Sequence, residues 1–548
     1  MKREKKRIFE KPSIRIEIEK EHQGIREGSK VVNFFFFVLA ISISSLSYIL
    51  SQPKFNIYYL SFIFYLPLHI LWRGYGQIKQ FLFAGFIAYF VVIHWITHAI
   101  THYGGFSYVF SLLPLSLLSL ALSAFFLLFG YIRSQLNIKL KIPFSLADPI
   151  IWVSTEYIKT FLFTGFPWAL VGYSLWQKTS LIQTADIGGV YIVSFFIILI
   201  QGFLCDTYDR IINRINSTTL FISFIITFSL SSLYLTYSFI RKTEIEINVA
   251  SVKDEIPVVV VQPNIPQDIK WTPELKSKYL RKNIELTISA IDYPHKSLFA
   301  VWPETALTFI LDLETELKNE LLDFASKGFY IIAGGIGYSR EIKDEKVKEI
   351  FYNRAYFITP QKEIYHYDKT HLVIFGEYIP LRSVIEKIPF VRKMIEDVEK
   401  VAGDFTPGKE VKPLGKEIKV GVPICFESIF PQITRKMVKD GADFIAVITN
   451  DGWFGYSSGP FQHFSVSVFR AVETRRFLVR SANTGISGVF SPTGKIIYQT
   501  KLLEEKSFLT KIKPLQIQSF YVRYGDLFSI SCVCILTMLF ILSLIIKK

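Results

Sequence analysis

The stretch Gly421-Val422-Pro423-Ile424-Cys425-Phe426-Glu427-Ser428 predicts a sharp turn at the end of a β-strand. An apolar run over residues 418–424 leads into it, an amphipathic run over 429–439 follows, and 444–449 has the composition of a second strand. This order predicts a βαβ unit with Cys425 at the carboxyl end of its first strand. In open α/β sheets that edge holds binding and catalytic sites, because side chains there project into a crevice. We therefore expect the site to be organised around Cys425.

Two roles fit a cysteine at this place. A thiol can be an activated nucleophile if its neighbours stabilise the thiolate and supply a base. A free cysteine is also often a small buried hydrophobe. The chain has four cysteines, which suggest no disulfide framework, because Cys205, Cys532 and Cys534 lie in or beside apolar runs. Only Cys425 belongs to the polar part of the chain, and this isolation favours the catalytic role.

The 548 residues are 50% hydrophobic and 16% aromatic, which indicates membrane spans. The polarity is uneven along the chain. It predicts a basic tail over 1–30, a seven-helix transmembrane domain over 31–240, a globular α/β domain over 245–525 and a last transmembrane helix over 527–546. The net charge of +15 comes from dispersed lysines and arginines. Basic residues flanking membrane spans explain it better than nucleic-acid binding, so we expect no nucleic-acid partner.

Basic residues also predict the orientation in the membrane. The tail holds ten Lys and Arg against six Glu, and the second, fourth and sixth loops are richer in them than the loops between. The positive-inside rule then places both termini in the cytoplasm and, after seven crossings, the globular domain outside. The expected spans before that domain are 31–51, 56–72, 80–101, 106–131, 146–166, 181–204 and 218–239.

Two polar features interrupt the apolar runs. Glu156 and Lys159 lie three residues apart, so they would share one helix face and could pair, either as a functional group inside the membrane or as an interfacial pair at a helix end. His94, His98 and His102 would also share a face. No carboxylate or thiol accompanies these histidines, so solvated interfacial side chains fit them better than a metal site, and we expect no metal.

Three reactive side chains follow predicted strands of the globular domain: Glu304, Lys369 and Cys425. Each alone is compatible with a solvated or buried residue. Together they form a chemical unit, because a carboxylate can move the thiol proton and an ammonium can stabilise a thiolate and an oxyanion. The backbone N–H of Phe426 is placed as a second oxyanion donor. Alternating strands and helices with several hairpins predict a mixed α/β sandwich around this site.

These residues also carry a family resemblance. Trp302-Pro303-Glu304, Asp368-Lys369-Thr370-His371 and Cys425-Phe426-Glu427 resemble the Glu-Lys-Cys motifs of the nitrilase superfamily, which implies an αββα sandwich and acyl-cysteine chemistry. Further motifs resemble the bacterial apolipoprotein N-acyltransferases over about 31–546. They are Thr164-Gly165-Phe166-Pro167-Trp168, Pro263-Asn264-Ile265, Lys270-Trp271, Phe375-Gly376-Glu377-Tyr378-Ile379-Pro380 and Asn450-Asp451-Gly452-Trp453-Phe454-Gly455.

The resemblance implies a two-step reaction at the periplasmic face of the bacterial inner membrane. Cys425 would take an acyl chain from the sn-1 ester of a phospholipid, typically phosphatidylethanolamine, and pass it to the amino-terminal S-diacylglyceryl-cysteine of an apolipoprotein. Glu304 would be the general base and acid, and Lys369 the oxyanion stabiliser. No cofactor is implied, and we expect a monomer.

The other family positions are implied in the same way. Glu377 and Glu427 would position the triad or the substrate. Trp271, Tyr378, Asn450, Trp453 and Gly455 would line the lipid site. One position departs from the pattern, because Phe426 stands where many members have tyrosine, which bears on donor preference and rate.

Two rival functions remain at this point. A membrane-tethered amidase would use the same residues but needs water at the thioester, whereas acyl transfer needs a dry site and an amine. A transporter or receptor with an external binding domain would need polar span centres and internal repeats, which the sequence does not convincingly show.

Overall fold

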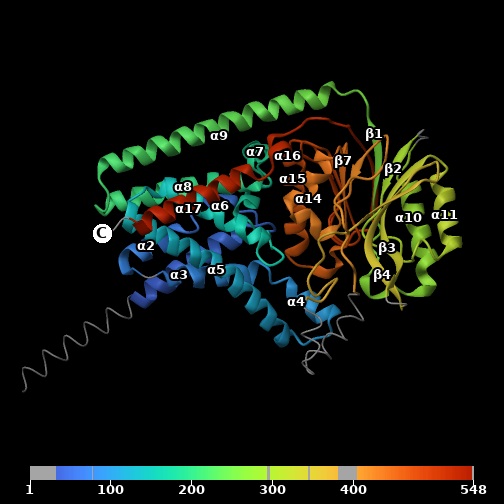
Figure 1. The fold of residues 1–548 in the computed structure, drawn as a ribbon, viewed down its shortest axis with the longest axis horizontal. Helices are drawn as coiled ribbons and strands as arrows, with labels where there is room; N and C mark the ends of the chain where they lie inside the picture. Colours follow the sequence, from blue (N-terminus) through green and yellow to red (C-terminus); the bar gives the residue numbers. More distant parts are fainter. Residues whose placement is uncertain (1–32, 77, 293–296, 344–345, 381–403, 546–548) are drawn as a thin grey trace, which may run out of the picture.

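The computed structural model describes residues 33–76, 78–292, 297–343, 346–380 and 404–545 (Figure 1). The predicted basic tail, residues 1–30, lies outside the described residues. Figure 1 shows a helical array on one side and a sandwich of two β-sheets on the other. The helices of the array are Asn33–Ser51, α2 Leu66–Tyr75, α3 Lys79–Val92, α4 Ile96–His98, α5 Tyr108–Leu140, α6 Phe144–Phe161, α7 Ala185–Gly188, α8 Val190–Ile211, α9 Ser217–Ser251 and α17 Leu527–Ile545.

By length and composition, five described helices could cross a membrane: Asn33–Ser51, α5, α8, α9 and α17. A sixth crossing results if α3 and the following segment Ile96–Tyr103 form one span, although they meet at an angle of 55°. The sequence predicts eight spans, so two of the expected ones need an explanation.

Local sequence explains the two differences. The run 56–72 is divided into a 3₁₀ helix, Tyr58–Phe62, and the short α2, which begins with a proline in its first turn. The run 146–166 forms the 18-residue α6, which contains Pro149 and three charged residues, Asp148, Glu156 and Lys159. The structure therefore describes both segments as helical, but neither as a long apolar helix.

The sandwich consists of a six-stranded and a five-stranded sheet, each with both parallel and antiparallel pairs. The first has the order β11-β1-β2-β3-β4-β5 and the second β10-β9-β8-β7-β6. The bounds are β1 Ile256–Gln262, β2 Leu298–Val301, β3 Phe329–Lys343, β4 Lys346–Ile358, β5 Ile364–Asp368, β6 Val420–Gly421, β7 Phe444–Thr449, β8 Leu478–Ala482, β9 Gly488–Phe490, β10 Ile496–Gln499 and β11 Lys506–Ile512.

Strand β1 shows how the layers are packed. Val258 and Val260 belong to the core between the two sheets, where Phe299 of β2 meets Phe444 of β7 with ring centroids 5.5 Å apart. Val259 belongs to a second core beneath α10, Lys276–Ser289, and α11, Thr315–Ala325. Side chains alternate across a strand, so a strand buried on both faces is apolar throughout.

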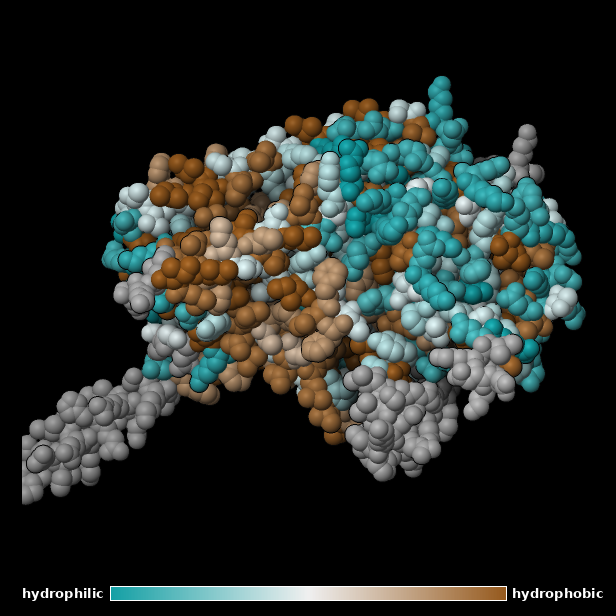
Figure 2. Space-filling model, in the orientation of Figure 1, coloured by the Kyte–Doolittle hydropathy of each residue, from teal (hydrophilic) through white to brown (hydrophobic). Residues whose placement is uncertain are grey.

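Helices α14, Pro431–Lys439, and α15, Gly459–Thr474, form the other outer layer. They lie between the second sheet and the helical array (Figure 1). Gln462 of α15 accepts hydrogen bonds from the indole N–H groups of Trp95 and Trp168, at 3.1 and 2.6 Å. Figure 2 shows hydrophobic residues gathered over the helical array and hydrophilic ones over the sandwich. Both parts of the predicted fold class are thus confirmed: an array with helices long enough to cross a bilayer, and an αββα sandwich.

Candidate active site

Cys425 opens a 3₁₀ turn, Cys425–Ile429, which three residues separate from the end of β6, the edge strand of the second sheet. Its backbone has φ +50°, in the left-handed region that residues with a side chain rarely adopt. A sharp turn of this kind directs the side chain away from the end of the strand instead of continuing the ladder. The predicted turn around Cys425 is present, although β6 itself covers only Val420–Gly421 and not 418–424.

Glu427 joins this turn to the loop after β5. Its Oε2 atom accepts the backbone N–H of Ile424 at 2.9 Å. Its Oε1 atom accepts the N–H of Thr370 at 2.7 Å and the hydroxyl of Tyr367 at 2.7 Å. The buried carboxylate therefore fixes the segment that carries Lys369 against the segment that carries Cys425. Burial raises the pKa of Glu427, and these donors counteract the rise.

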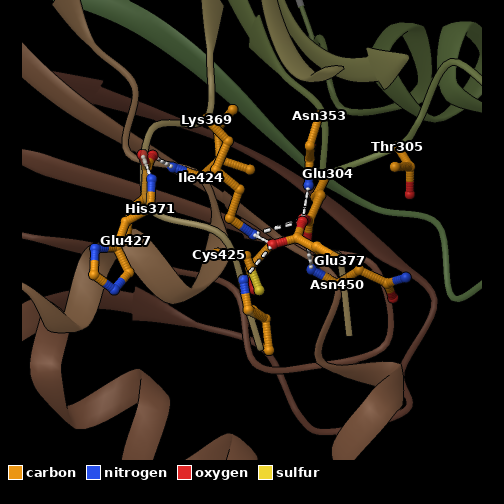
Figure 3. Close-up of polar contacts among 12 residues, drawn as sticks. Glu304, Thr305, Asn353, Lys369, His371, Glu377, Ile424, Cys425, Glu427 and Asn450 are labelled. Atoms are coloured by element: carbon orange, nitrogen blue, oxygen red, sulfur yellow. Dashed lines mark hydrogen bonds and ion pairs between the residues drawn. The ribbon is translucent and has the colours of Figure 1, made fainter. Parts of the chain in front are cut away.

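Two carboxylates surround the ammonium group of Lys369. Its Nζ atom lies 2.9 Å from Glu377 and 3.6 Å from Oε1 of Glu304. The amide of Asn353 donates to both, at 2.7 Å to Glu304 and 2.6 Å to Glu377. The backbone N–H of Asn450 donates to the other oxygen of Glu304 at 2.8 Å. Figure 3 shows these groups facing one another, with the sulfur of Cys425 beside them.

The electrostatics of the cluster follow from burial. Burial and then Glu304 raise the pKa of the Cys425 thiol, and Lys369 lowers it in part. Burial alone would lower the pKa of Lys369, but Glu377, Glu304 and Cys425 raise it well above its ordinary value. The lysine is therefore a permanent cation at neutral pH and the resting thiol is protonated. An arrangement of this kind can transfer a proton from thiol to carboxylate as the sulfur attacks, with a fixed positive charge nearby.

The expected lipid-site residues lie around this cluster in different ways. Asn450 is buried against Gln267, 2.6 Å from its side-chain oxygen. Trp453 packs on Tyr103 of the helical array, with ring centroids 4.7 Å apart. Trp271 is 41% exposed, and Tyr378 is half-buried. The hydrogen bonds of Glu304 and Lys369 go instead to Asn353, Asn450 and Glu377.

Gly455 and Phe426 have clear local constraints. Gly455 has φ +56°, and a Cβ atom there would lie 2.5 Å from the ring of His98, so the close approach of the array requires glycine. Phe426 points its ring toward Phe166, Phe430 and His371, at centroid distances of 6.4, 5.3 and 6.0 Å. A phenyl ring fits this aromatic contact without a hydroxyl.

Two residues of the cluster were not singled out from the sequence as parts of the site. Asn353 bridges the carboxylates from the middle of β4, and an asparagine inside a strand is the available signal, since strands are poor in it. Lys270 is buried and donates to the carbonyl of Glu304 at 3.1 Å and to the hydroxyl of Thr305 at 2.6 Å. Burial lowers the pKa of Lys270 to about 7, and Glu304 opposes the shift. The motif Lys270-Trp271 marks this lysine in the sequence, but only Trp271 was expected in the site.

The polar groups of the apolar runs have partners other than those expected. Lys159 donates to the hydroxyl of Tyr89 at 2.9 Å, whereas Glu156 accepts the backbone N–H of Val171 at 2.8 Å. The two are therefore not a direct ion pair. His98 and His102 stack at 5.1 Å, and His102 faces Asp268 at 3.4 Å. Among the described residues, no group of three histidine, cysteine or acidic side chains is placed to hold a metal ion.

Comparison with known proteins agrees with this architecture. Residues 44–203 match the apolipoprotein N-acyltransferase N-terminal domain, and residues 258–521 match the carbon-nitrogen hydrolase domain. The chain is 34% identical to an apolipoprotein N-acyltransferase of Geobacter metallireducens over 88% of this chain and 91% of that protein. It is 31% identical to one of Haemophilus ducreyi over 83% and 86%.

Solved structures with a similar domain include a CN-hydrolase superfamily protein of Xanthomonas campestris. It is 15% identical, covers 50% of this chain and 95% of its own, and has a TM-score of 0.34. The sequence relatives decide the family: the chain belongs to the apolipoprotein N-acyltransferases.

Proposed function

We propose that this enzyme transfers a fatty acyl chain from the sn-1 position of a phospholipid, typically phosphatidylethanolamine, to the α-amine of an amino-terminal S-diacylglyceryl-cysteine. The observation that carries the proposal is the cluster of Glu304, Lys369 and Cys425 in a chain of this family. The acceptor would be a diacylglyceryl-modified apolipoprotein. Both substrates carry acyl chains that lie in a membrane, so a catalytic domain attached to membrane-spanning helices can reach them.

In the first step, the sulfur of Cys425 attacks the ester carbonyl while Glu304 takes the thiol proton. The raised pKa of the thiol makes such a base necessary at neutral pH. Lys369 and the backbone N–H of Phe426 stabilise the oxyanion. The carbon–oxygen ester bond then breaks, Glu304 protonates the leaving alkoxide, and a lysophospholipid departs. An acyl thioester remains on Cys425.

In the second step, the acceptor amine attacks the thioester carbonyl and Glu304 takes a proton from the nitrogen. The carbon–sulfur bond breaks, the proton returns to the sulfur, and an amide is formed. Glu377 would hold Lys369, Glu427 would hold the nucleophile turn, and Trp271, Tyr378, Asn450, Trp453 and Gly455 would border the lipid site.

The same proposal includes the topology. Residues 31–240 and 527–546 would lie in the bacterial inner membrane, both termini in the cytoplasm and 245–525 in the periplasm, with the chain acting as a monomer. If α3 and Ile96–Tyr103 cross as one bent span, five spans precede the sandwich, and seven if α2 and α6 also cross. Both numbers are odd, so either one supports opposite sides for the tail and the sandwich.

The test is the intact mass of the detergent-purified chain after incubation with phosphatidylethanolamine, beside Cys425→Ser. We expect a mass gain of one acyl chain that hydroxylamine removes and that the variant does not form as a thioester. A diacylglyceryl lipopeptide should then discharge the thioester into an amide. Discharge by water alone would favour an amidase, and a free Cys425 thiol after incubation would refute acyl transfer.

A further inference from the structure

A second buried network contacts the nucleophile turn. It consists of Ser428 from the turn, His463 from α15, Asp451 from the 3₁₀ turn that follows β7, and Arg480 from the middle of β8. All four side chains are buried. The proton transfers of the proposed mechanism use none of them, although the network ends on the backbone of Cys425.

The contacts converge on one oxygen atom, the carbonyl oxygen of Cys425. The hydroxyl of Ser428 donates to it at 2.8 Å. Nε2 of His463 lies 3.1 Å from the same oxygen and 2.8 Å from the Ser428 hydroxyl. A carbonyl oxygen can only accept, and the serine proton is already directed at it, so Nε2 must carry a proton to bond either atom.

The far side of the ring faces an ion pair. Nδ1 of His463 lies 3.0 Å from the guanidinium of Arg480. The same guanidinium holds Asp451 at 2.9 Å, and Asp451 lies 2.8 Å from Nδ1. A carboxylate oxygen can only accept, so Nδ1 donates to Asp451 while Nε2 faces the carbonyl, and both ring nitrogens meet an acceptor. Asp451 and Arg480 thereby fix the ring orientation.

The importance of the carbonyl oxygen lies in the peptide group to which it belongs. The C=O of Cys425 and the N–H of Phe426 are the two ends of a single planar peptide unit. Donors at the oxygen draw electron density from the nitrogen and make the N–H a stronger donor, and they also fix the plane of the group. This N–H is the backbone oxyanion donor of the proposed reaction.

We propose that Ser428 and His463 are positioning residues that orient and polarise the Cys425–Phe426 peptide group for oxyanion stabilisation. The inference rests on the proposed function and adds a role that Glu304, Lys369 and Glu427 do not provide. Glu427 holds the N–H of Ile424 before the nucleophile, whereas Ser428 and His463 hold the carbonyl after it. The turn with φ +50° at Cys425 is thus fixed on both sides.

The test separates two reactions of the same thiol in the full-length chain in detergent. Acylation by phosphatidylethanolamine passes through an oxyanion, whereas alkylation by iodoacetamide displaces iodide and forms none. The variants are Ser428→Ala, His463→Leu and His463→Gln, whose amide can replace the Nε2 donor. The control is Ser467→Ala, a buried serine on α15 whose hydroxyl has no partner among the described residues.

We expect Ser428→Ala and His463→Leu to slow single-turnover acylation about tenfold, less than the roughly 100- to 1,000-fold that removal of an oxyanion donor causes. Alkylation of Cys425, located by peptide mass, should keep its wild-type rate. His463→Gln should recover part of the acylation rate. The thioester carbonyl band of the ¹³C-labelled acyl-enzyme should move to higher wavenumber in Ser428→Ala, because its hydrogen bonds weaken.

Unchanged acylation and an unshifted carbonyl band in Ser428→Ala would overturn the inference. Parallel losses of acylation and alkylation would also overturn it, since they would show a displaced thiol and a merely structural role. Failure of the wild-type chain to form any thioester would instead refute the proposed function, so the two failures are distinguishable.

Discussion

The two outer helix layers of the sandwich carry their charges in opposite environments. On the α10–α11 side, ion pairs such as Lys276 with Glu314 and Lys318 with Asp312 are 31–48% exposed. On the α15 side, Arg470 pairs with Glu473 and Arg475 with Asp186 of α7 at 0–1% exposure. Both layers cover a sheet, but only the second is itself covered by the helical array (Figure 1).

This difference shows that the contribution of an ion pair to stability depends on whether another element covers it. An ion pair in water contributes little to stability, because water solvates each partner well without it. In a buried pair, each charge is stabilised mainly by its partner. If one partner is removed, the other remains buried without water to solvate it, which is strongly destabilising. The nucleophile turn packs against the covered layer, where the hydrogen bonds of His463 reach it. The following changes test this comparison, from the largest expected effect to the smallest.

The largest effect is expected for the buried cation of the site. Lys369→Met should lower the rate of thioester formation roughly 1,000-fold or more, because the oxyanion loses a fixed charge and the thiol loses the cation that lowers its pKa. Single-turnover mass spectrometry measures the rate. The matched control is Lys318→Met, a partly exposed lysine on α11 that should keep the wild-type rate. Equal rates of thioester formation in the two variants would contradict the prediction that the buried cation, and not the partly exposed one, is needed for the reaction.

The next effect is on stability. Arg470→Met should lower the free energy of unfolding by about 3–5 kcal/mol, because Glu473 would remain buried without its cation. The double change Arg470→Met with Glu473→Leu should recover much of the loss, since no lone charge remains. Thermal unfolding in one detergent, followed by tryptophan fluorescence, compares the variants. A double variant as unstable as the single one would show that packing and not charge is responsible.

A smaller effect depends on pH. Burial alone would raise the pKa of Asp451, but Arg480 and His463 lower it to about 2. The native carboxylate therefore binds a proton less readily than the unfolded one, and it contributes about 2 kcal/mol above pH 4 that is lost as the pH falls from about 4 to about 2. The free energy of unfolding of wild type and Asp451→Asn should accordingly converge over this range. A constant difference between them would contradict the lowered pKa.

The smallest effect is expected on the water-facing layer. Lys276→Met removes a pair with Glu314 at 2.6 Å, yet it should change the free energy of unfolding by less than about 1 kcal/mol because both groups are solvated. The measurement is the same thermal unfolding. A loss as large as that of Arg470→Met would erase the contrast between the two layers.

The sequence determined the parts of this protein that depend on local pattern. Apolar runs indicated the helical array, alternating strands and helices indicated the sandwich, and strand ends indicated Glu304, Lys369 and Cys425. Hydrophobic periodicity is a property of neighbouring residues, so it can be recognised without the fold. The positions at which the helices break were harder to predict. The chain breaks between α7 and α8 at Gly189, which has φ +66°, and it bends after α3. Both positions lie within apolar runs, so hydrophobicity does not mark them.

Only the tertiary structure decided which polar residues meet. Asn353 between two carboxylates, buried Lys270, and His463 against the Cys425 carbonyl are each far in sequence from their partners. Their residue types resemble those of solvated positions, and burial distinguishes them only after the chain has folded. The same reason explains the two outer layers: a charged helix presents the same pattern whether water or another helix covers it, and the covering helices come from a distant part of the chain.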